Sequence, residues 1–229
     1  GKSYFPNQTP RATYAAMISY LDEQVGDLVN KLKEIGQFNN TLIIFTSDNG
    51  PTYTGGADTE FFESAKPFKT TLGWAKGFVN EGGIRVPMIA SWPGKIKSGS
   101  KSNQISAFQD MMPTFCDIVG IDPPENIDGI SIKATFLGDY QKVKHDYLYW
   151  EFPAYKGQQA VRMGKWKGIR KNIFEGNMSI ELYNLDLDHQ EQNNVALSYP
   201  EIVEKISNIM IEAHYPSSIL RFKFPQLGD

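Results

Sequence analysis

The sequence predicts an α/β fold followed by a small antiparallel sheet with a packed helix. Three observations lead to this prediction. A long amphipathic helix pattern at about residues 11–35 is followed by a short apolar strand pattern at 41–46. Four strand-like runs with hairpin-sized gaps lie between residues 147 and 185. A last amphipathic helix pattern covers about residues 200–214.

The composition is that of an ordinary globular chain. Of its 229 residues, 41% are hydrophobic and 21% are charged, and the formal net charge is −3. Because charges of both signs are interspersed, the sequence lacks the basic surface that binds nucleic acid. The longest aliphatic or aromatic run, Leu42–Phe45, is far shorter than a membrane span. We therefore expect neither a nucleic-acid partner nor a membrane-spanning segment.

The first helix and strand form half of an α/β unit. Gly36 is placed to end the helix, and Asn39 and Asn40 turn the chain into the strand Thr41–Thr46. This strand is short, apolar and rich in β-formers, so we expect it to be buried and parallel to its neighbours. The apolar face of the helix is formed by Tyr14, Met17, Ile18, Leu21, Val25, Leu28, Val29, Leu32 and Ile35.

The middle of the chain predicts a second core strand and a short helix. The strand covers Ile84–Trp92 and is interrupted by Pro87. Asp110 is placed to cap a helix that ends at Gly120. We expect Phe115, Ile118 and Val119 to face inward on this helix. Cys116, the single cysteine, lies in the same apolar stretch and is expected to be a small buried side chain.

The last ninety or so residues have a different pattern, which predicts a second subdomain. We divide the chain into residues 1–137 and residues 138–229. A tight turn is expected at Met163–Lys165. The alternation of charged and apolar residues over Lys165–Lys171 predicts a half-exposed strand. The expected strands are Tyr147–Phe152, Gln159–Met163, Trp166–Arg170 and Ile180–Leu185.

Asp48 and Asn49 are candidate metal ligands. They follow the Thr41–Thr46 strand directly, at the carboxyl end where ligand sites cluster in open α/β sheets. Their side-chain oxygens suit a hard cation such as Ca²⁺. Asp-Asn-Gly is also a common turn in which the side chains bond their own backbone, so the pair by itself leaves both interpretations open.

Lys76 is a candidate anion-binding residue. It precedes Glu81 by five residues in a loop region, where a lysine can meet an anionic oxygen as a point charge. An ordinary solvated lysine is the alternative. Glu81 and Arg85 suggest a structural ion pair around the tight Gly82-Gly83 segment.

The order of these motifs resembles the type I sulfatases of the alkaline phosphatase superfamily. The resemblance rests on Ile43-Ile-Phe-Thr-Ser-Asp-Asn-Gly50, then Lys76, Glu81-Gly-Gly-Ile-Arg-Val-Pro87 and Trp92-Pro-Gly94. It continues through Asp110–Thr114, the 160–167 hairpin and Leu182–Leu185, and so covers nearly the whole chain. It implies that residues 1–137 are part of an alkaline-phosphatase-like α/β sandwich.

The resemblance also implies a chemistry. Such enzymes hydrolyse sulfate esters with a formylglycine nucleophile and calcium. Asp48 and Asn49 would then be two of the calcium ligands, and Lys76 would contact a sulfate oxygen. The expected substrate is a sulfated glycan or a small aryl sulfate, and the expected location is periplasmic or secreted.

One part of the family pattern has no counterpart in the chain. The formylglycine motif, Cys- or Ser-x-Pro-x-Arg, is not found, since Cys116 is followed by Asp-Ile-Val and Ser91-Trp-Pro-Gly-Lys95 ends in lysine. We expect the nucleophile and further calcium ligands to lie outside this chain, which would be inactive alone. Surface left open by the missing part would favour self-association.

Two other functions remain open at this point. A phosphodiesterase or phosphonate monoester hydrolase would share the scaffold and metal geometry, and a degenerate homologue would have no catalysis. Tyr149, Trp150, Glu151 and Arg162 could line a sugar site, although the core of the small sheet is the interpretation we favour. The three histidines, His145, His189 and His214, are expected to have surface or packing roles.

Overall fold

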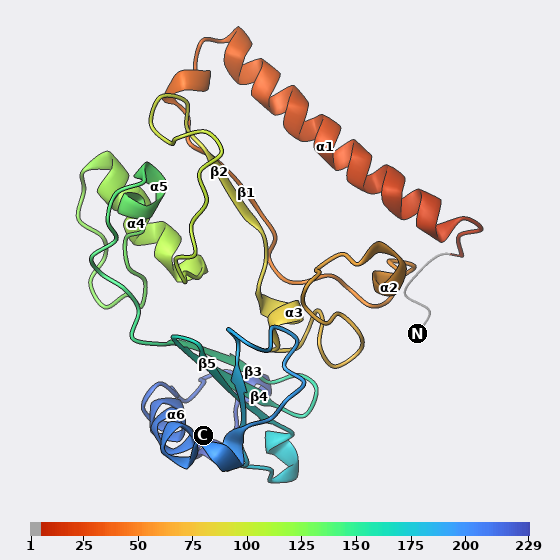
Figure 1. The fold of residues 1–229 in the computed structure, drawn as a ribbon, viewed down its shortest axis with the longest axis vertical. Coiled ribbons are helices and arrows are strands. Elements are labelled where there is room, and N and C mark those ends of the chain that lie inside the picture. Colours follow the sequence, from red (N-terminus) through yellow and green to blue (C-terminus); the bar gives the residue numbers. More distant parts are fainter. Residues whose placement is uncertain (1–5) are drawn as a thin grey trace. The chain divides into compact units, whose positions relative to one another are not determined.

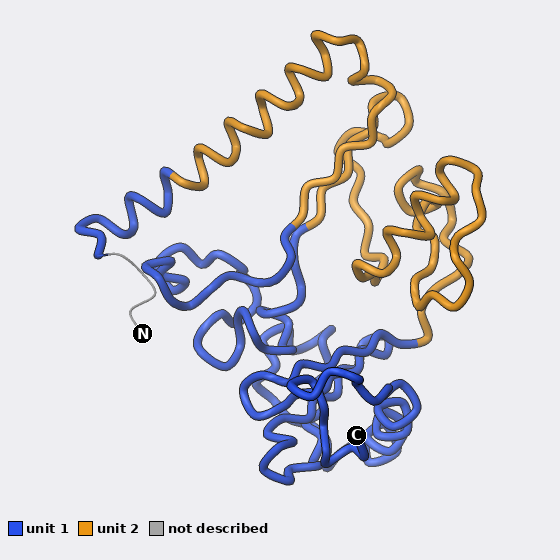
Figure 2. Tube along the Cα trace, turned by 180° about the vertical axis from the view of Figure 1, so that it is seen from behind, with its two compact units in different colours: residues 1–16, 47–87, 147–229 blue, residues 17–46, 88–146 orange. Residues whose placement is uncertain are grey.

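The computed structural model describes residues 6–229, and the first five residues of the predicted amino-terminal part lie outside it. The chain forms two compact units (Figure 2). Unit 1 contains the residues up to 16 together with 47–87 and 147–229, and unit 2 contains 17–46 and 88–146. The division at residue 137 that the sequence suggested stays a prediction.

Helix α1 (Pro10–Glu34) is the long amphipathic helix that the sequence predicted (Figure 1). Gly36 follows it with a φ of 71°, a left-handed conformation that glycine adopts without a steric penalty. None of the helix residues is buried. Apolar side chains such as Met17 and Leu28, 64% and 57% exposed, therefore form an uncovered apolar face.

The predicted strand after α1 exists but differs from the expectation in two ways. Strand β1 (Ile43–Thr46) pairs antiparallel with β2 (Met88–Ser91), Ile43 opposite Ser91, so the parallel expectation was wrong. No residue of β1 is buried, and Phe45 is 38% exposed. Between the two strands the chain makes the one-turn helices α2 (Thr59–Phe62) and α3 (Glu81–Ile84) but no long crossover helix. The direction of β1 is set by its pairing with β2, a strand far along the chain that the local pattern does not reveal.

The second predicted strand was wrong at its beginning, where the chain forms helix α3. Ile84, where the strand was expected to begin, is the last residue of helix α3, and the paired strand β2 starts at Met88. The two glycines before Ile84 explain the difference, because their close contacts with surrounding carbonyl groups, described below, favour a compact turn over an extended strand.

Helix α4 (Met111–Val119) ends at Gly120 as predicted, and Cys116 is buried. The prediction that Asp110 caps the helix was wrong, because its side-chain oxygens accept from the Ala107 and Ile130 amides instead. The predicted inward face was wrong for Phe115 and Val119, which are 44% and 66% exposed. Thr114 causes the rotation. Its hydroxyl donates to the Asp110 carbonyl at 2.6 Å and accepts from the Ile132 amide at 2.9 Å, which turns the polar side of α4 toward the 130–132 loop.

The carboxy-terminal strands form the antiparallel sheet that the sequence predicted (Figure 1). Strands β3 (Leu148–Phe152), β4 (Gln158–Met163), β5 (Trp166–Lys171) and β6 (Glu181–Asn184) are neighbours in chain order. Met163 pairs with Trp166, so Gly164 and Lys165 form the expected tight turn. The remaining elements are α5 (Lys133–Leu137), α6 (Pro200–Glu212) and 3₁₀ turns at Phe38–Asn40, Phe108–Asp110, Ile173–Glu175, Ala196–Ser198, Leu220–Phe222 and Pro225–Leu227.

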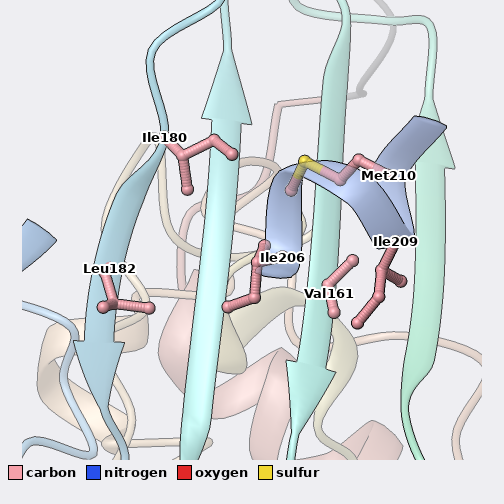
Figure 3. Packing of buried hydrophobic residues seen from close by; sticks show 6 residues of the cluster. All are labelled: Val161, Ile180, Leu182, Ile206, Ile209 and Met210. Carbon is pink, nitrogen blue, oxygen red and sulfur yellow. The ribbon is translucent and has the colours of Figure 1, made fainter. Parts of the chain in front are cut away.

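Both faces of this sheet are covered, by different kinds of structure. Helix α6 packs on one face, where Val161, Ile180 and Leu182 meet its apolar side chains (Figure 3). Gly168 of β5 leaves the space for Ile206, because a Cβ there would lie 2.6 Å from Ile206 Cγ2. The opposite face carries a second cluster that includes Val79 from the loop region before α3. The sheet therefore supports the 76–84 segment on the face away from α6.

None of the helices in residues 6–229 combines the length and the hydropathy needed to cross a bilayer.

Ile206→Ala should destabilise the carboxy-terminal sheet by about 2–5 kcal/mol. The Ile206 side chain extends from α6 onto Gly168 and is fully buried, so its removal leaves a cavity. Leu197→Ala is the matched control, because Leu197 is fully exposed and should change stability by less than about 0.5 kcal/mol. Denaturant unfolding followed by tryptophan fluorescence measures both. Equal effects of the two substitutions would contradict the packing described here.

Candidate functional site

The Ser47–Gly50 segment presents two open oxygen ligands. The Ser47 hydroxyl donates to the Asn49 carbonyl at 2.9 Å, and Asn49 Nδ2 donates to the Gly50 carbonyl at 2.9 Å. Within residues 6–229, the carboxylate of the exposed Asp48 and Asn49 Oδ1 accept no hydrogen bond. The turn interpretation therefore holds for Ser47 and for the Asn49 amide nitrogen, while the oxygens stay free for a cation.

Three glycines fix this segment by close backbone contact. The Gly50 amide donates to the Gly83 carbonyl at 2.8 Å. A Cβ at Gly50 would lie 1.8 Å from the Gly82 carbonyl oxygen, and one at Gly82 would lie 1.9 Å from the Lys69 carbonyl oxygen. At Gly83 the corresponding clash is with Phe78 O at 2.1 Å. Backbone oxygens cannot move aside as a flexible side chain can, so the Asp-Asn-Gly and Glu-Gly-Gly motifs are parts of one junction.

Lys76 approaches the same segment through its main chain. The Lys76 amide donates to the Pro51 carbonyl at 3.1 Å, which places the Lys76 backbone beside the residue that follows Gly50. The Lys76 side chain is exposed and has no ion pair among the described residues. The structure thus brings the main chains of all three predicted site residues into one region of unit 1.

Aromatic rings lie next to Lys76. Phe78 stacks on Tyr155 with ring centroids 4.5 Å apart, and the hydroxyl groups of Tyr53 and Tyr155 are 3.0 Å apart. Gly77 has a φ of 90°, and a Cβ at this position would lie 2.6 Å from the Tyr155 ring. The loop that carries Lys76 is therefore packed under Tyr155.

A buried ion network anchors α3 to the sheet. Lys167 Nζ lies 2.8 Å from Glu81 Oε1 and 2.9 Å from Glu191 Oε1, and all three side chains are at most 5% exposed. Glu191 Oε2 also accepts from the Glu81 amide at 2.9 Å. Arg85 and Arg162 contact Glu81 Oε2 at 3.1 and 3.4 Å, so the predicted Glu81–Arg85 pair is confirmed.

The charge balance of this network decides the ionisation of Glu81. Burial alone would raise its pKa, but Lys167, Arg162 and Arg85 together outweigh burial and lower the pKa below the ordinary value for a glutamate. Sequence reasoning missed Lys167 and Glu191. The alternating pattern of Lys165–Lys171 suggested half-exposed positions, whereas Lys167 is fully buried because its charge is neutralised by carboxylates distant in the sequence.

The candidate sugar-binding residues of β3 and β4 take part in internal contacts. Tyr149 OH accepts from Gln159 Nε2 at 2.7 Å, Trp150 packs against the second core cluster, and Arg162 donates to the Gly164 carbonyl. Glu151 pairs with His214 at 2.9 Å. These contacts favour the sheet-core interpretation for the four residues.

Two histidines also bind carboxylates. His145 Nε2 lies 2.7 Å from Asp110 Oδ1, and His214 bridges Glu151 and Asp229. Burial would lower the pKa of His214, but the two carboxylates outweigh burial and raise it. Both histidines therefore have structural partners, as the sequence suggested.

The donor set fits part of a calcium site. Carboxylate and amide oxygens are the ligands that Ca²⁺ prefers, and it takes six to eight of them. Asp48 and Asn49 would provide two. No group of three or more histidine, cysteine, aspartate or glutamate side chains in residues 6–229 is arranged to hold a metal.

The chain belongs to the sulfatase family. The sulfatase family model matches residues 2–121, and the model of the carboxy-terminal region of N-sulphoglucosamine sulphohydrolase matches residues 72–215. The fold agrees with this assignment, and the predicted alkaline-phosphatase-like α/β class is confirmed by the solved structures that resemble the chain.

Particular relatives extend the comparison. An N-acetylglucosamine-6-O-sulfatase of Bacteroides thetaiotaomicron is 33% identical over 192 residues, which cover 80% of this chain and 31% of that protein. The crystal structure of Ps i-CgsB in complex with k-i-k-neocarrahexaose is similar with a TM-score of 0.77 at 30% identity, covering 91% of this chain and 44% of that one. A phosphonate monoester hydrolase of Agrobacterium radiobacter shares the fold, with a TM-score of 0.66 at 24% identity over 88% of this chain and 40% of its own. The chain thus spans less than half the length of each.

Lys167→Met should destabilise unit 1 by about 3–5 kcal/mol, because it leaves the buried Glu81 and Glu191 carboxylates without their shared cation. Lys165→Met, two residues away at an exposed position, is the control and should change stability by less than about 0.5 kcal/mol. Denaturant unfolding of both variants at neutral pH is the measurement. A Lys167→Met variant as stable as the control would show that the network contributes little.

Proposed function

We propose that the protein containing this chain is a sulfuric ester hydrolase that acts on a sulfated carbohydrate or an aryl sulfate. The observation that carries the proposal is the hydrogen bond from the Lys76 amide to the Pro51 carbonyl. It brings the Lys76 main chain next to the segment that carries Asp48 and Asn49, and we propose that the exposed lysine side chain extends toward their oxygens. A cation and a metal site at one point suit a sulfate group, whose oxygens carry the negative charge of the ester.

Each residue has a proposed task. Asp48 and Asn49 act as two of the calcium ligands, held at a fixed separation by the glycine junction behind them. Calcium, when bound, would polarise the sulfate ester. The Lys76 ammonium donates a hydrogen bond to a sulfate oxygen and stabilises the negative charge that grows there. The nucleophile, which we propose is a formylglycine, comes from a residue outside this chain.

The names of the relatives support a sulfated glycan as the proposed substrate of this protein. The bacterial relative is named for the 6-O-sulfate of N-acetylglucosamine, and Ps i-CgsB was crystallised with an oligosaccharide. The aromatic group formed by Tyr53, Phe78 and Tyr155 beside Lys76 also suits a sugar ring. A periplasmic or secreted location is part of this proposal.

A phosphonate monoester hydrolase is the second candidate. Its support is the fold shared with the Agrobacterium radiobacter enzyme, because calcium ligands and a lysine would serve a phosphonate ester as well as a sulfate ester. A homologue without catalysis is the third candidate. Turnover of an aryl sulfate and an aryl phosphonate ester by the complete enzyme separates all three.

The chain alone should hydrolyse no aryl sulfate above the rate of a calcium-only control, because covalent catalysis needs the absent nucleophile.

The chain alone should also self-associate, since the apolar faces of α1 and β1 are exposed. Product release from 4-nitrophenyl sulfate and light scattering measure the two properties. Turnover above the control, or a monomer at all concentrations, would contradict the corresponding half of this proposal.

In the complete enzyme, Asp48→Ala and Lys76→Ala should reduce activity for different reasons. Asp48→Ala should abolish activity and calcium binding together. Lys76→Ala should lower kcat by about 10²–10³-fold, as loss of one charge-stabilising group does, with calcium affinity unchanged. Asp122→Ala and Lys97→Ala, at exposed positions, are the matched controls. Calcium titration and steady-state kinetics give both readouts, and unchanged turnover in Lys76→Ala would overturn the assignment.

A further inference from the structure

The loop that carries Lys76 is held by one buried glutamine of the sheet. Gln158, the first residue of β4, is 1% exposed. Its Oε1 accepts from the Val79 amide at 3.3 Å, and its Nε2 donates to the Gly77 carbonyl at 3.0 Å. We infer that Gln158 is the positioning residue for Lys76, and that it sets the place from which the lysine ammonium reaches the sulfate. This inference rests on the proposed function.

A carboxamide suits this position for a chemical reason. The loop offers one peptide acceptor, at the half-buried Gly77, and one peptide donor, at the buried Val79, and groups shielded from water in this way need hydrogen-bond partners. Glutamine supplies a donor and an acceptor on one planar group. An ionised glutamate supplies acceptors alone, and methionine fills the same volume with neither.

Gln158 is held in a rigid position on the sheet. Gln158 lies on β4, which has a neighbour on each side, and it pairs with Phe152 of β3 and with Lys171 of β5. A side chain on a paired central strand holds a more defined position than one on a loop. The position of Gly77 and Val79 is therefore tied to the sheet.

Two further contacts complete the support of the loop. The Lys76 amide is bonded to the Pro51 carbonyl, and the Tyr155 ring covers Gly77 and stacks on Phe78. The main chain on both sides of Lys76 is thus fixed, and the ammonium can move through the torsions of its own side chain. Loss of the Gln158 bonds would release the carboxyl-terminal side of this support.

The neighbouring residue provides a matched control. Gln159 is fully buried and makes two 2.7 Å hydrogen bonds, one donated to Tyr149 OH and one accepted from Arg170 Nη1. As the next residue along β4, it points to the other face of the sheet, and none of its bonds reaches residues 76–79. Gln159→Met therefore removes a comparable buried glutamine without touching the lysine loop.

The experiment compares Gln158→Met and Gln159→Met in the complete enzyme, with and without Lys76→Ala. Gln158→Met should lower kcat by about 10-fold, because a small displacement of the ammonium costs charge stabilisation. It should also weaken inhibition by inorganic sulfate, while calcium affinity stays unchanged, since Asp48 and Asn49 are held by other contacts. Gln159→Met should leave kcat and sulfate inhibition unchanged at an equal folded fraction.

The Lys76→Ala background shows whether the effect passes through the lysine. There, Gln158→Met should lower kcat by less than about 2-fold, because the group that it positions is gone. Full additivity, or a kcat of Gln158→Met equal to that of Gln159→Met, overturns the inference. If Lys76→Ala itself has wild-type turnover, the proposed function fails, which is a different outcome from failure of the positioning role.

A glutamate variant keeps the test valid if Gln158→Met does not fold. Gln158→Glu retains the acceptor for Val79 but places a carboxylate oxygen against the Gly77 carbonyl. Burial raises the pKa of such a carboxyl, and when protonated it donates to Gly77 as the amide does. Its kcat relative to wild type should therefore rise as pH falls. A ratio that is constant with pH overturns the inference.

Discussion

The close approach of backbone segments around Gly50, Gly82 and Gly83 is the constraint on which the candidate site depends. Each glycine faces a carbonyl oxygen where a Cβ would stand, and the Gly50–Gly83 hydrogen bond joins the Ser47–Gly50 segment to helix α3. Any side chain at these positions would force main chain apart from main chain. The location of Asp48 and Asn49 is therefore set by backbone contacts, and the two side chains are free to offer their oxygens outward.

Helix α3 needs its own anchor, and the buried charges provide it. Removing Glu81 from water is unfavourable unless its charge is paired, and Lys167 pairs it together with Glu191. This network occupies the face of the small sheet opposite α6, while the α6 face carries the apolar cluster around Ile206 together with the hydrogen bonds of Gln159. The two faces of the sheet therefore have different roles. Packing against α6 stabilises it, and the other face fixes the loops that carry the proposed catalytic groups.

The difference between what the sequence predicted and what it did not follows from where the information lies. Helix α1 and strands β3–β6 were predicted because their periodic patterns are complete within each segment. The Glu81–Arg85 pair was predicted because both partners lie in one motif. The direction of β1, by contrast, depends on β2, and the burial of Lys167 depends on Glu81, 86 residues away. The rotation of α4 depends on one hydroxyl, that of Thr114, which a hydropathy pattern ignores.

The site residues show a division between rigid and adaptable parts. Asp48 and Asn49 follow a strand and are held by a glycine junction, which suits metal ligands because coordination requires fixed distances. Lys76 lies on a loop, but its main chain is bonded at Pro51 and its neighbours Gly77 and Val79 are bonded to Gln158. The four-carbon stem of lysine then supplies the remaining freedom as a mobile point charge. In the proposed enzyme the fixed main chain sets the region that the ammonium can reach, and the side-chain torsions adjust its contact with a sulfate oxygen.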